Sequence, residues 1–234
     1  MTDIHCHLLY GLDDGAQSIE DSKKMLDRAG KQNITDIILT PHWRRGMFRY
    51  DIERADRHFS ELKDYAVQTG INIYPGAEYH VDKDIIDSIK NGKVHTLADG
   101  KYVLTEYSHD SEFSYIKWMT RELMYNGYIP VIAHVERYLC MTDDFDNMDE
   151  LKNMGALIQV NADSVAGIDG RPLKKLCKQM IKEELIDVIA SDCHNTGTRA
   201  CHMAECYKYL NKEFDEATAV KLMQDNPSKI LVHC

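Results

Sequence analysis

Strand-like and helix-like segments alternate along the whole sequence, and this alternation limits the possible folds more than any other feature. Short apolar runs typical of buried strands are separated by longer stretches with helical spacing of their apolar residues. The expected strands occupy residues 3–7, 36–40, 72–77, 102–105, 128–133, 156–160 and 187–190. This pattern is typical of an α/β fold whose parallel sheet is covered by helices. Seven such strands predict a distorted, TIM-like (β/α) barrel, and a doubly wound open sheet is the alternative.

The size and charge of the chain narrow its class. With 234 residues and no Pro/Gly-rich linker, residues 1–234 are expected to form a single domain with a full core. No apolar run is long enough to insert into a membrane, and the acidic N-terminal segment is unlike a signal peptide. Seven cysteines without a CxxC pair indicate reduced thiols and a cytoplasmic location. The net charge of −10, without a long basic patch, argues against nucleic acid as a partner.

Histidine and carboxylate side chains recur where the expected strands end. These nine residues are His5, His7, Asp14, His42, Glu78, Glu106, His134, Asp192 and His194. His5 and His7 lie two apart on a strand, so both rings are expected on the same face. In a parallel barrel the carboxyl ends of the strands meet at one face. The sequence therefore predicts that residues far apart in the chain surround one cavity.

A buried cluster of this composition needs cations. Carboxylates held close together repel, and each ionised group loses hydration on burial. The nitrogen and oxygen ligands, without a thiolate, suit Mn²⁺, Fe²⁺ or Zn²⁺, and nine ligands are too many for a single ion. Clustered ions bridged by carboxylates can activate water and bind phosphoryl oxygens. Arg137 and Arg199 follow two of the candidate ligands and offer the paired donors that suit a phosphate.

Two other segments have competing interpretations. Cys193 and Arg199 have the Cys-x5-Arg spacing of thiol-based tyrosine phosphatases. The loop between them has one glycine, and the neighbouring Asp192 is expected to raise the thiol pKa, so we interpret the spacing as accidental. The segment 43–50 mixes aromatic and basic residues. It is either a clamp for a phosphotyrosine ring with acidic flanks or an ordinary loop packed on the barrel.

Six motifs carry a family resemblance, and together they span nearly the whole chain in order. They are Asp3-Ile-His-Cys-His7, Gly11-Leu-Asp-Asp-Gly15, Thr40-Pro-His42, Gly76-Ala-Glu78, Ala133-His-Val-Glu-Arg-Tyr138 and Ser191-Asp-Cys-His194. The chain resembles the PHP (polymerase and histidinol phosphatase) superfamily, and within it the bacterial metal-dependent protein-tyrosine phosphatases of capsule and exopolysaccharide loci. The family often has Pro where this chain has Tyr10 and Val135, and a small residue where it has Cys193. These departures flank the ligands and replace none of them.

The resemblance implies a PHP fold, a distorted seven-stranded barrel, with three divalent ions that are often Mn²⁺. Carried over, the first ion takes His5, His7, Glu78 and Asp192, the second takes Glu78, Glu106 and His134, and the third takes Asp14, His42 and His194. Arg137 and Arg199 hold the phosphate, and His42 is a candidate proton donor to the leaving group.

From these residues we expect a protein-tyrosine phosphatase that hydrolyses phosphotyrosine through attack by a metal-bound hydroxide. The resemblance implies that the substrate is a bacterial tyrosine autokinase and that the reaction regulates capsular or exopolysaccharide synthesis. A small-molecule phosphatase such as histidinol-phosphate phosphatase is the alternative within enzymes. A catalytically inactive barrel that acts as a docking protein is the alternative from another class.

Overall fold

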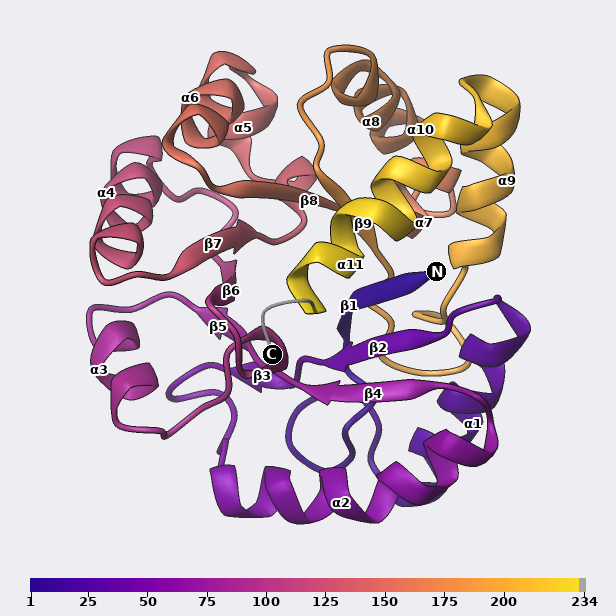
Figure 1. Cartoon of the computed structure of the whole chain (residues 1–234). Coiled ribbons are helices and arrows are strands. Elements are labelled where there is room, and N and C mark those ends of the chain that lie inside the picture. Colours follow the sequence, from indigo (N-terminus) through magenta and orange to yellow (C-terminus); the bar gives the residue numbers. More distant parts are fainter. Residues whose placement is uncertain (232–234) are drawn as a thin grey trace.

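The computed structural model describes residues 1–231, in which parallel strands lie at the centre and helices cover them from outside (Figure 1). The strands are β1 (Thr2–Cys6), β2 (Asp36–Leu39), β3 (His42–Trp43), β4 (Asn72–Pro75), β5 (Glu78–His80), β6 (Tyr102–Glu106), β7 (Ile129–Ile132), β8 (Leu157–Asn161) and β9 (Val188–Ala190). Every recorded strand pair is parallel. The predicted α/β class with a parallel sheet covered by helices is confirmed, and the sheet is curled.

The helices fill the connections between the strands. They are α1 (Ile19–Lys31), α2 (Ile52–Gln68), α3 (Ile85–Lys90), α4 (Phe113–Tyr125), α5 (Leu139–Thr142), α6 (Asp146–Met154), α7 (Ala162–Ala166), α8 (Arg171–Lys182), α9 (Met203–Glu213), α10 (Glu216–Val220) and α11 (Asn226–Leu231). Short helical turns lie at η1 (Leu97–Asp99), η2 (Val135–Arg137) and η3 (Lys221–Asp225). Among the helices of residues 1–231, none has the length and hydropathy needed to cross a bilayer.

The expected count of seven strands is not confirmed, because nine strands form two sheets within residues 1–231. One sheet has the order β1-β2-β4 and the other the order β3-β5-β6-β7-β8-β9. The strand is interrupted between β2 and β3 at Pro41, which has no N–H to donate to a neighbouring strand. A second interruption separates β4 from β5 at Gly76, where an added Cβ would lie 2.7 Å from Cγ2 of Ile38. Strands β3 and β5 are too short for their sequences to show a strand pattern.

The first and last strands lie side by side, which a doubly wound sheet does not allow. The backbone N–H of Asp192 donates to the carbonyl of His5 at 2.8 Å, and that of His7 donates to the carbonyl of Cys193 at 2.9 Å. These bonds join the end of β1 to the residues that follow β9. The alternative of an open doubly wound sheet is therefore wrong, and two pairs of candidate ligands become neighbours.

Apolar side chains fill the space below the strand ends. Ile4, Ile38, Leu104 and Val131 belong to one buried cluster, which Ile230 of α11 joins. Figure 1 shows α11 lying next to β1 across one end of the sheets. Full burial of a side chain of this size contributes roughly 1.5–3 kcal/mol to stability. The other end of the sheets, where the strands finish, carries the polar residues.

A register shift within β1 separates these two environments. The pairing of β1 with β2 is irregular between Asp3 and Cys6. Ile4 packs in the inner apolar cluster, whereas the rings of His5 and His7 face each other at the strand end, with 3.2 Å between their Nε2 atoms. A bulge of this kind changes which face a side chain takes, and it is common beside functional sites. The predicted placement of His5 and His7 on one face is confirmed.

Candidate metal centre

Four ligand atoms meet beside the end of β1, the start of β5 and the residues that follow β9. Nε2 of His5 lies 3.3 Å from Oε2 of Glu78 and 3.5 Å from Oδ1 of Asp192. Nε2 of His7 lies 3.3 Å and 3.4 Å from the same two oxygens. Nitrogen and oxygen ligands about 2.0–2.2 Å from a tetrahedral ion are roughly 3.3–3.6 Å from one another. The spacing of these atoms therefore suits a single divalent cation between them.

A second set of side chains borders the first on the β6–β7 side. Nε2 of His134 lies 2.9 Å from Oε1 of Glu78 and 3.9 Å from Oε1 of Glu106. The strand register brings these elements together, because Glu106 on β6 pairs with His80, two residues after Glu78 on β5. Glu78, completely buried, reaches both sets with its two oxygens. A carboxylate in this position can bridge two ions.

A third set lies toward the loop after β1. Oδ1 of Asp14 lies 3.6 Å from Nε2 of His42 and 3.5 Å from Nε2 of His194. The rings of His7 and His194 are stacked with 3.8 Å between their centroids, which places this set against the first. All nine residues named from the sequence thus lie within one continuous cluster.

Several buried atoms of the cluster have no hydrogen-bond partner within residues 1–231. Nδ1 of His42 and Oε2 of Glu78 lie 2.9 Å apart without the geometry of a hydrogen bond, and Nε2 of His194 is also unpartnered. A buried polar atom without a partner costs about 1–3 kcal/mol. Because these atoms belong to histidine and carboxylate ligands, divalent cations would satisfy them. The residues present therefore fit a metal centre.

Burial and charge act against each other in the cluster. Burial raises the pKa of Glu78 and Asp192, but the neighbouring His5 and other cationic groups outweigh it, so both pKa values are held well below the usual range. Burial lowers the pKa of His5, but Glu78 and Asp192 raise it, and the net pKa is raised. Without metal, these histidines take up protons to balance the carboxylates. Protons and divalent cations therefore compete for the same atoms.

The loop after β1 positions His7 and His42 through a residue that the sequence reasoning missed. Oδ2 of Asp13 lies 2.7 Å from Nδ1 of His7 and accepts the backbone N–H of His42 at 2.8 Å. Oδ1 of Asp13 accepts the N–H of Gly15 at 2.8 Å. An added Cβ at Gly15 would lie 2.1 Å from the carbonyl oxygen of His7, so only glycine permits this close approach. The Asp-Asp pair in Gly11-Leu-Asp-Asp-Gly15 was the available signal.

A second hydrogen-bond network that supports the ligands comes from β8, a strand on which the sequence predicted no ligand. Oε1 of Gln159 lies 3.1 Å from Nδ1 of His5 and accepts the N–H of His134 at 3.0 Å. The amide of Gln159 donates to Asn161, which donates to Oδ2 of Asp192 at 2.8 Å. Both side chains are buried. Two polar residues at alternate positions of an apolar strand could have indicated this network from sequence.

Arg137 and Arg199 both reach the cluster from its rim. Nη1 of Arg137 lies 3.1 Å from Oδ2 of Asp192. Nη1 of Arg199 lies 3.2 Å from Oδ2 of Asp14, and its Nη2 lies 3.5 Å from Oδ1 of Asp192. Each guanidinium is about two-fifths exposed, at 40% and 41%, so each can also contact a bound anion. Both arginines therefore lie at the rim of the cluster, and their role in phosphate binding stays a prediction.

A pocket of about 470 Å³ opens onto the cluster between β5, β6 and the residues after β7. Glu106, His134 and Arg137 line it, together with Arg44 and His80. Nδ1 of His80 lies 3.2 Å from Oε2 of Glu106, so this histidine orients a candidate ligand. His80 was missed from the sequence, although it stands two residues after Glu78 in the same strand.

The Cys193 thiol differs from expectation in one respect. Hydrogen bonds from Cys201 and Cys6 hold the pKa of Cys193 well below its usual range, so the expected rise is wrong. The nearby thiols dominate because the Sγ atoms of Cys6 and Cys193 lie 3.3 Å apart. The side chain is only 4% exposed and packs in the core. The sulfur at this buried position therefore has no route to a substrate.

The loop from Cys193 to Arg199 also cannot cradle a phosphate. The N–H groups of His194 and Asn195 donate to the carbonyl of Arg199 at 2.9 and 3.2 Å. The N–H groups of Gly197 and Arg199 donate to Oδ1 of Asn195. A thiol-based phosphatase needs such amides free to hold the phosphate. The interpretation of the Cys-x5-Arg spacing as accidental therefore stands on the loop geometry.

Fold and cluster together define the class, a TIM-like α/β protein with histidine and carboxylate ligands at the carboxyl ends of its parallel strands. Residues 1–232 match the family model described as capsular polysaccharide synthesis, CpsB/CapC. This chain belongs to that family.

Named relatives cover nearly the whole chain. The tyrosine-protein phosphatase CpsB of Streptococcus pneumoniae is 31% identical over 99% of this chain and 98% of its own length. The tyrosine-protein phosphatase YwqE of Bacillus subtilis is 34% identical over 92% of this chain and 85% of its own length. A solved structure from the study of YwqE and CpsB, described as unique metal-dependent tyrosine phosphatases, matches with a TM-score of 0.90 and 33% identity. It covers 100% of this chain and 95% of that chain.

Proposed function

We propose that this protein is a metal-dependent protein-tyrosine phosphatase. The observation that carries the proposal is one cluster of nine histidine and carboxylate side chains, some of whose buried atoms, such as Oε2 of Glu78, lack hydrogen-bond partners. The relatives named above are tyrosine-protein phosphatases, and their solved structure is described as metal-dependent. Both lines point to hydrolysis of a phosphate monoester.

The three sets of side chains would each hold a divalent cation, and Mn²⁺ is our first choice, with Fe²⁺ or Zn²⁺ as alternatives. Such ions supply Lewis-acid charge for phosphoryl oxygens and lower the pKa of a coordinated water. We keep the ligand sets that the resemblance implies, with Glu78 shared between two of them. His42 fits the ligand role better than the proton-donor role, because its two ring nitrogens face Glu78 and Asp14. Its role as a proton donor stays a prediction.

Arg137 and Arg199 would bind the phosphate group at the rim. Their guanidinium groups now pair with Asp192 and Asp14, and both keep donors on their exposed sides. Charge placed in advance around the non-bridging oxygens stabilises the transition state more than it stabilises the substrate. A phenolate is a good leaving group, so the site does not depend on a strong general acid.

The substrate would be a phosphotyrosine protein, and we propose a bacterial tyrosine autokinase in capsular or exopolysaccharide synthesis. The family description and the names of the relatives favour this choice over histidinol phosphate. A lactococcal histidinol phosphate phosphatase shares only the fold, with a TM-score of 0.57 and 15% identity. The cytoplasmic location stays a prediction. We further propose that residues 1–234 form a single PHP domain in which β2–β3 and β4–β5 act as two interrupted strands of a seven-stranded barrel.

The test combines elemental analysis of the purified protein with turnover assays. We expect bound divalent metal, turnover of a phosphotyrosine peptide, and loss of that turnover with chelator. Faster turnover of histidinol phosphate than of the peptide would favour the small-molecule alternative. Absence of metal together with absence of turnover on both substrates would favour the inactive docking protein.

A further inference from the structure

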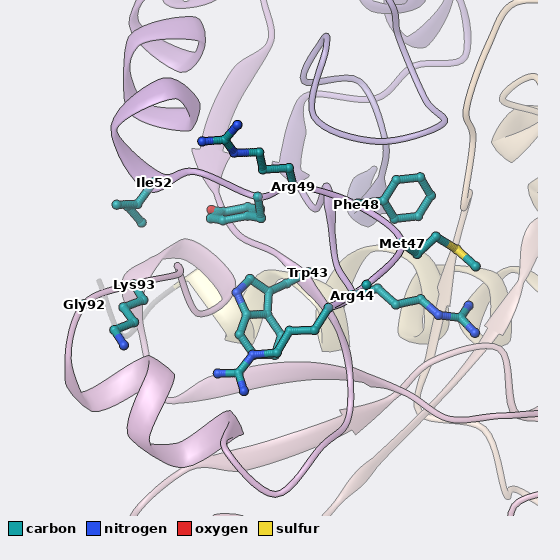
Figure 2. A pocket seen from close by; sticks show the side chains of 11 residues that line it. Trp43, Arg44, Met47, Phe48, Arg49, Ile52, Gly92 and Lys93 are labelled. Atoms are coloured by element: carbon teal, nitrogen blue, oxygen red, sulfur yellow. The ribbon is translucent and has the colours of Figure 1, made fainter.

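A second pocket, of about 730 Å³, lies beside the pocket of the metal centre. Its walls come from the segment 43–52 between β3 and α2, and from Gly92 and Lys93 after α3. Figure 2 shows the Trp43 ring in the middle, with Lys93 on one side and Phe48 and Met47 on the other. We call it the basic pocket.

Two residues join the basic pocket to the metal centre. Arg44 lines both pockets, and its Nη1 lies 4.0 Å from Oε2 of Glu106. The Phe48 ring stacks on the ring of His42, with 5.2 Å between centroids and 3° between planes. A polypeptide bound at the metal centre can therefore continue into the basic pocket along the same surface.

Positive charge distinguishes this pocket in a chain of net charge −10. Arg44, Arg45, Arg49 and Lys93 all line it. Arg45 is already paired, because it contacts Asp84 and lies 3.7 Å from Asp82, with its guanidinium 4.9 Å above the Trp43 ring. Arg49 and Lys93 are exposed and make no ion pair within residues 1–231. Their charge remains available to a ligand.

We propose that the basic pocket binds an anionic side chain that lies near the phosphotyrosine in the substrate polypeptide. This inference rests on the proposed function and adds the specificity of that same site. The charge of Arg49 and Lys93 selects a carboxylate or a phosphate. Trp43 and Phe48 line the pocket, and Met47, 59% exposed, offers an apolar contact at the rim. Since consecutive residues of an extended chain are about 3.3–3.6 Å apart, a neighbouring side chain can reach this pocket.

A single exposed ion pair of this kind adds little to the affinity for a substrate, but it distinguishes acidic substrates from neutral ones. Each contributes a factor of about 1.4 to 5 in affinity. Rim charges also speed the encounter with an oppositely charged partner, and salt reduces this effect. The pocket therefore favours acidic substrates over neutral ones without altering the chemistry at the metal centre.

The experiment compares Arg49→Gln and Lys93→Gln with wild type on three peptides. One peptide has glutamines beside the phosphotyrosine, one has glutamates, and one has a nearby non-hydrolysable phosphonate analogue of phosphotyrosine. Arg121→Gln on α4 and Lys175→Gln on α8 are the matched controls, because both side chains are exposed and neither lines the basic pocket. Free phosphotyrosine, which cannot reach the basic pocket, reports the basal reaction.

We expect each pocket variant to raise KM for the glutamate peptide by about two- to fivefold, with kcat and the glutamine peptide unchanged. The double variant should raise it about tenfold if the two effects add. A larger loss on the phosphonate peptide than on the glutamate peptide would assign the pocket to phosphate. The reverse order would assign it to carboxylate. Equal KM changes on acidic and neutral peptides, or no change on either, would overturn the proposal.

A binding measurement separates this proposal from the proposed function. Fluorescence anisotropy of the labelled glutamate peptide with chelator-treated protein needs no turnover. If wild type cleaves neither free phosphotyrosine nor any peptide, the proposed function fails, and the anisotropy still tests the pocket. If wild type cleaves all substrates and the variants bind the acidic peptide as tightly as wild type, the pocket proposal alone fails.

Discussion

Oδ2 of Asp13 lies 2.7 Å from Nδ1 of His7, which fixes the ring of a candidate ligand from behind. Burial raises the pKa of Asp13, but His7 beside it reverses the effect and the net pKa is lowered. Burial likewise lowers the pKa of His7, and Asp13 raises it well above the usual range. The pair holds Nε2 of His7 toward His5, Glu78 and Asp192. A residue that binds no ion in the proposed scheme thus orients one that does.

Replacement of Asp13 by Asn should weaken metal binding by about 10- to 100-fold, because outer carboxylates orient and polarise ligating histidines. Isothermal titration with Mn²⁺ measures this, and excess metal should restore most of the turnover. Asp64→Asn on α2 is the control, because this carboxylate is exposed and lies outside the cluster. Unchanged metal affinity in Asp13→Asn would show that the contact with His7 is only structural.

Joint replacement of His5 and His7 by Ala should lower phosphotyrosine-peptide turnover by more than about 100-fold and reduce bound metal in elemental analysis. Both rings face Glu78 and Asp192, so their loss removes half of the first ligand set. His202→Ala is the control, because this histidine pairs with Asp163 and lies outside the cluster and its pocket. Full turnover by the double variant would mean that the proposed site is incorrect.

Lysine in place of Arg137 or Arg199 should still lower kcat/KM by about 10-fold or more, because lysine keeps the charge and loses the planar, paired donors. Bound metal should stay at the wild-type level, since neither arginine is a proposed ligand. Steady-state kinetics with elemental analysis separates the two effects. Metal loss in these variants would instead assign the arginines to holding Asp14 and Asp192.

Serine in place of Cys193 should leave most of the turnover, whereas chelator should abolish it in wild type. The thiol is buried against Cys6, so the substitution should cost about 1–3 kcal/mol of stability through a buried hydroxyl. Thermal unfolding measures this cost, and Cys193→Ala supplies a second variant without the hydroxyl. The metal interpretation would be wrong if both variants were folded but inactive while chelator left wild type untouched.

His95 should make stability depend on pH. It lies 2.8 Å from Asp56 of α2 and 2.7 Å from Asp99 of η1. Burial lowers the pKa of His95, but these carboxylates outweigh it and the net pKa lies above 6.5. The contribution is therefore complete below pH 6.5 and is lost as pH rises through the folded-state pKa. With partners as exposed as these, it should be below about 1 kcal/mol per pair.

Urea unfolding of chelator-treated wild type and His95→Gln over this pH range measures the effect, since bound metal would add a pH dependence of its own. The difference between the two proteins should shrink as pH rises. His109→Gln controls for loss of an exposed imidazole. A constant difference across the range would rule out a titrating contribution from His95.

Local pattern determined most of the framework. Apolar runs bounded by turns predicted strands at the positions of β1, β2, β4, β6, β7, β8 and β9. Local chemistry also sets the start of α1, where the side chain of Ser18 accepts the backbone N–H of Asp21. The nine candidate ligands could be predicted from the sequence because parallel strands place their carboxyl ends at one face. All of these features depend on neighbours in the sequence or on one general rule of topology.

Only the tertiary structure decided the features that depend on contacts between distant residues. Gln159 supports His5 across 154 positions, and Cys6 meets Cys193 across 187, which reverses the expected direction of the Cys193 pKa. Strands β3 and β5 form because they pair with neighbouring strands. Each is too short for alternation of apolar and polar residues to be recognised in the sequence. The basic pocket likewise forms only where the loop after β3 meets the turn after α3. The periodicity of a segment indicates which face of its strand or helix a residue occupies. Which side chain packs against that residue depends on the tertiary fold.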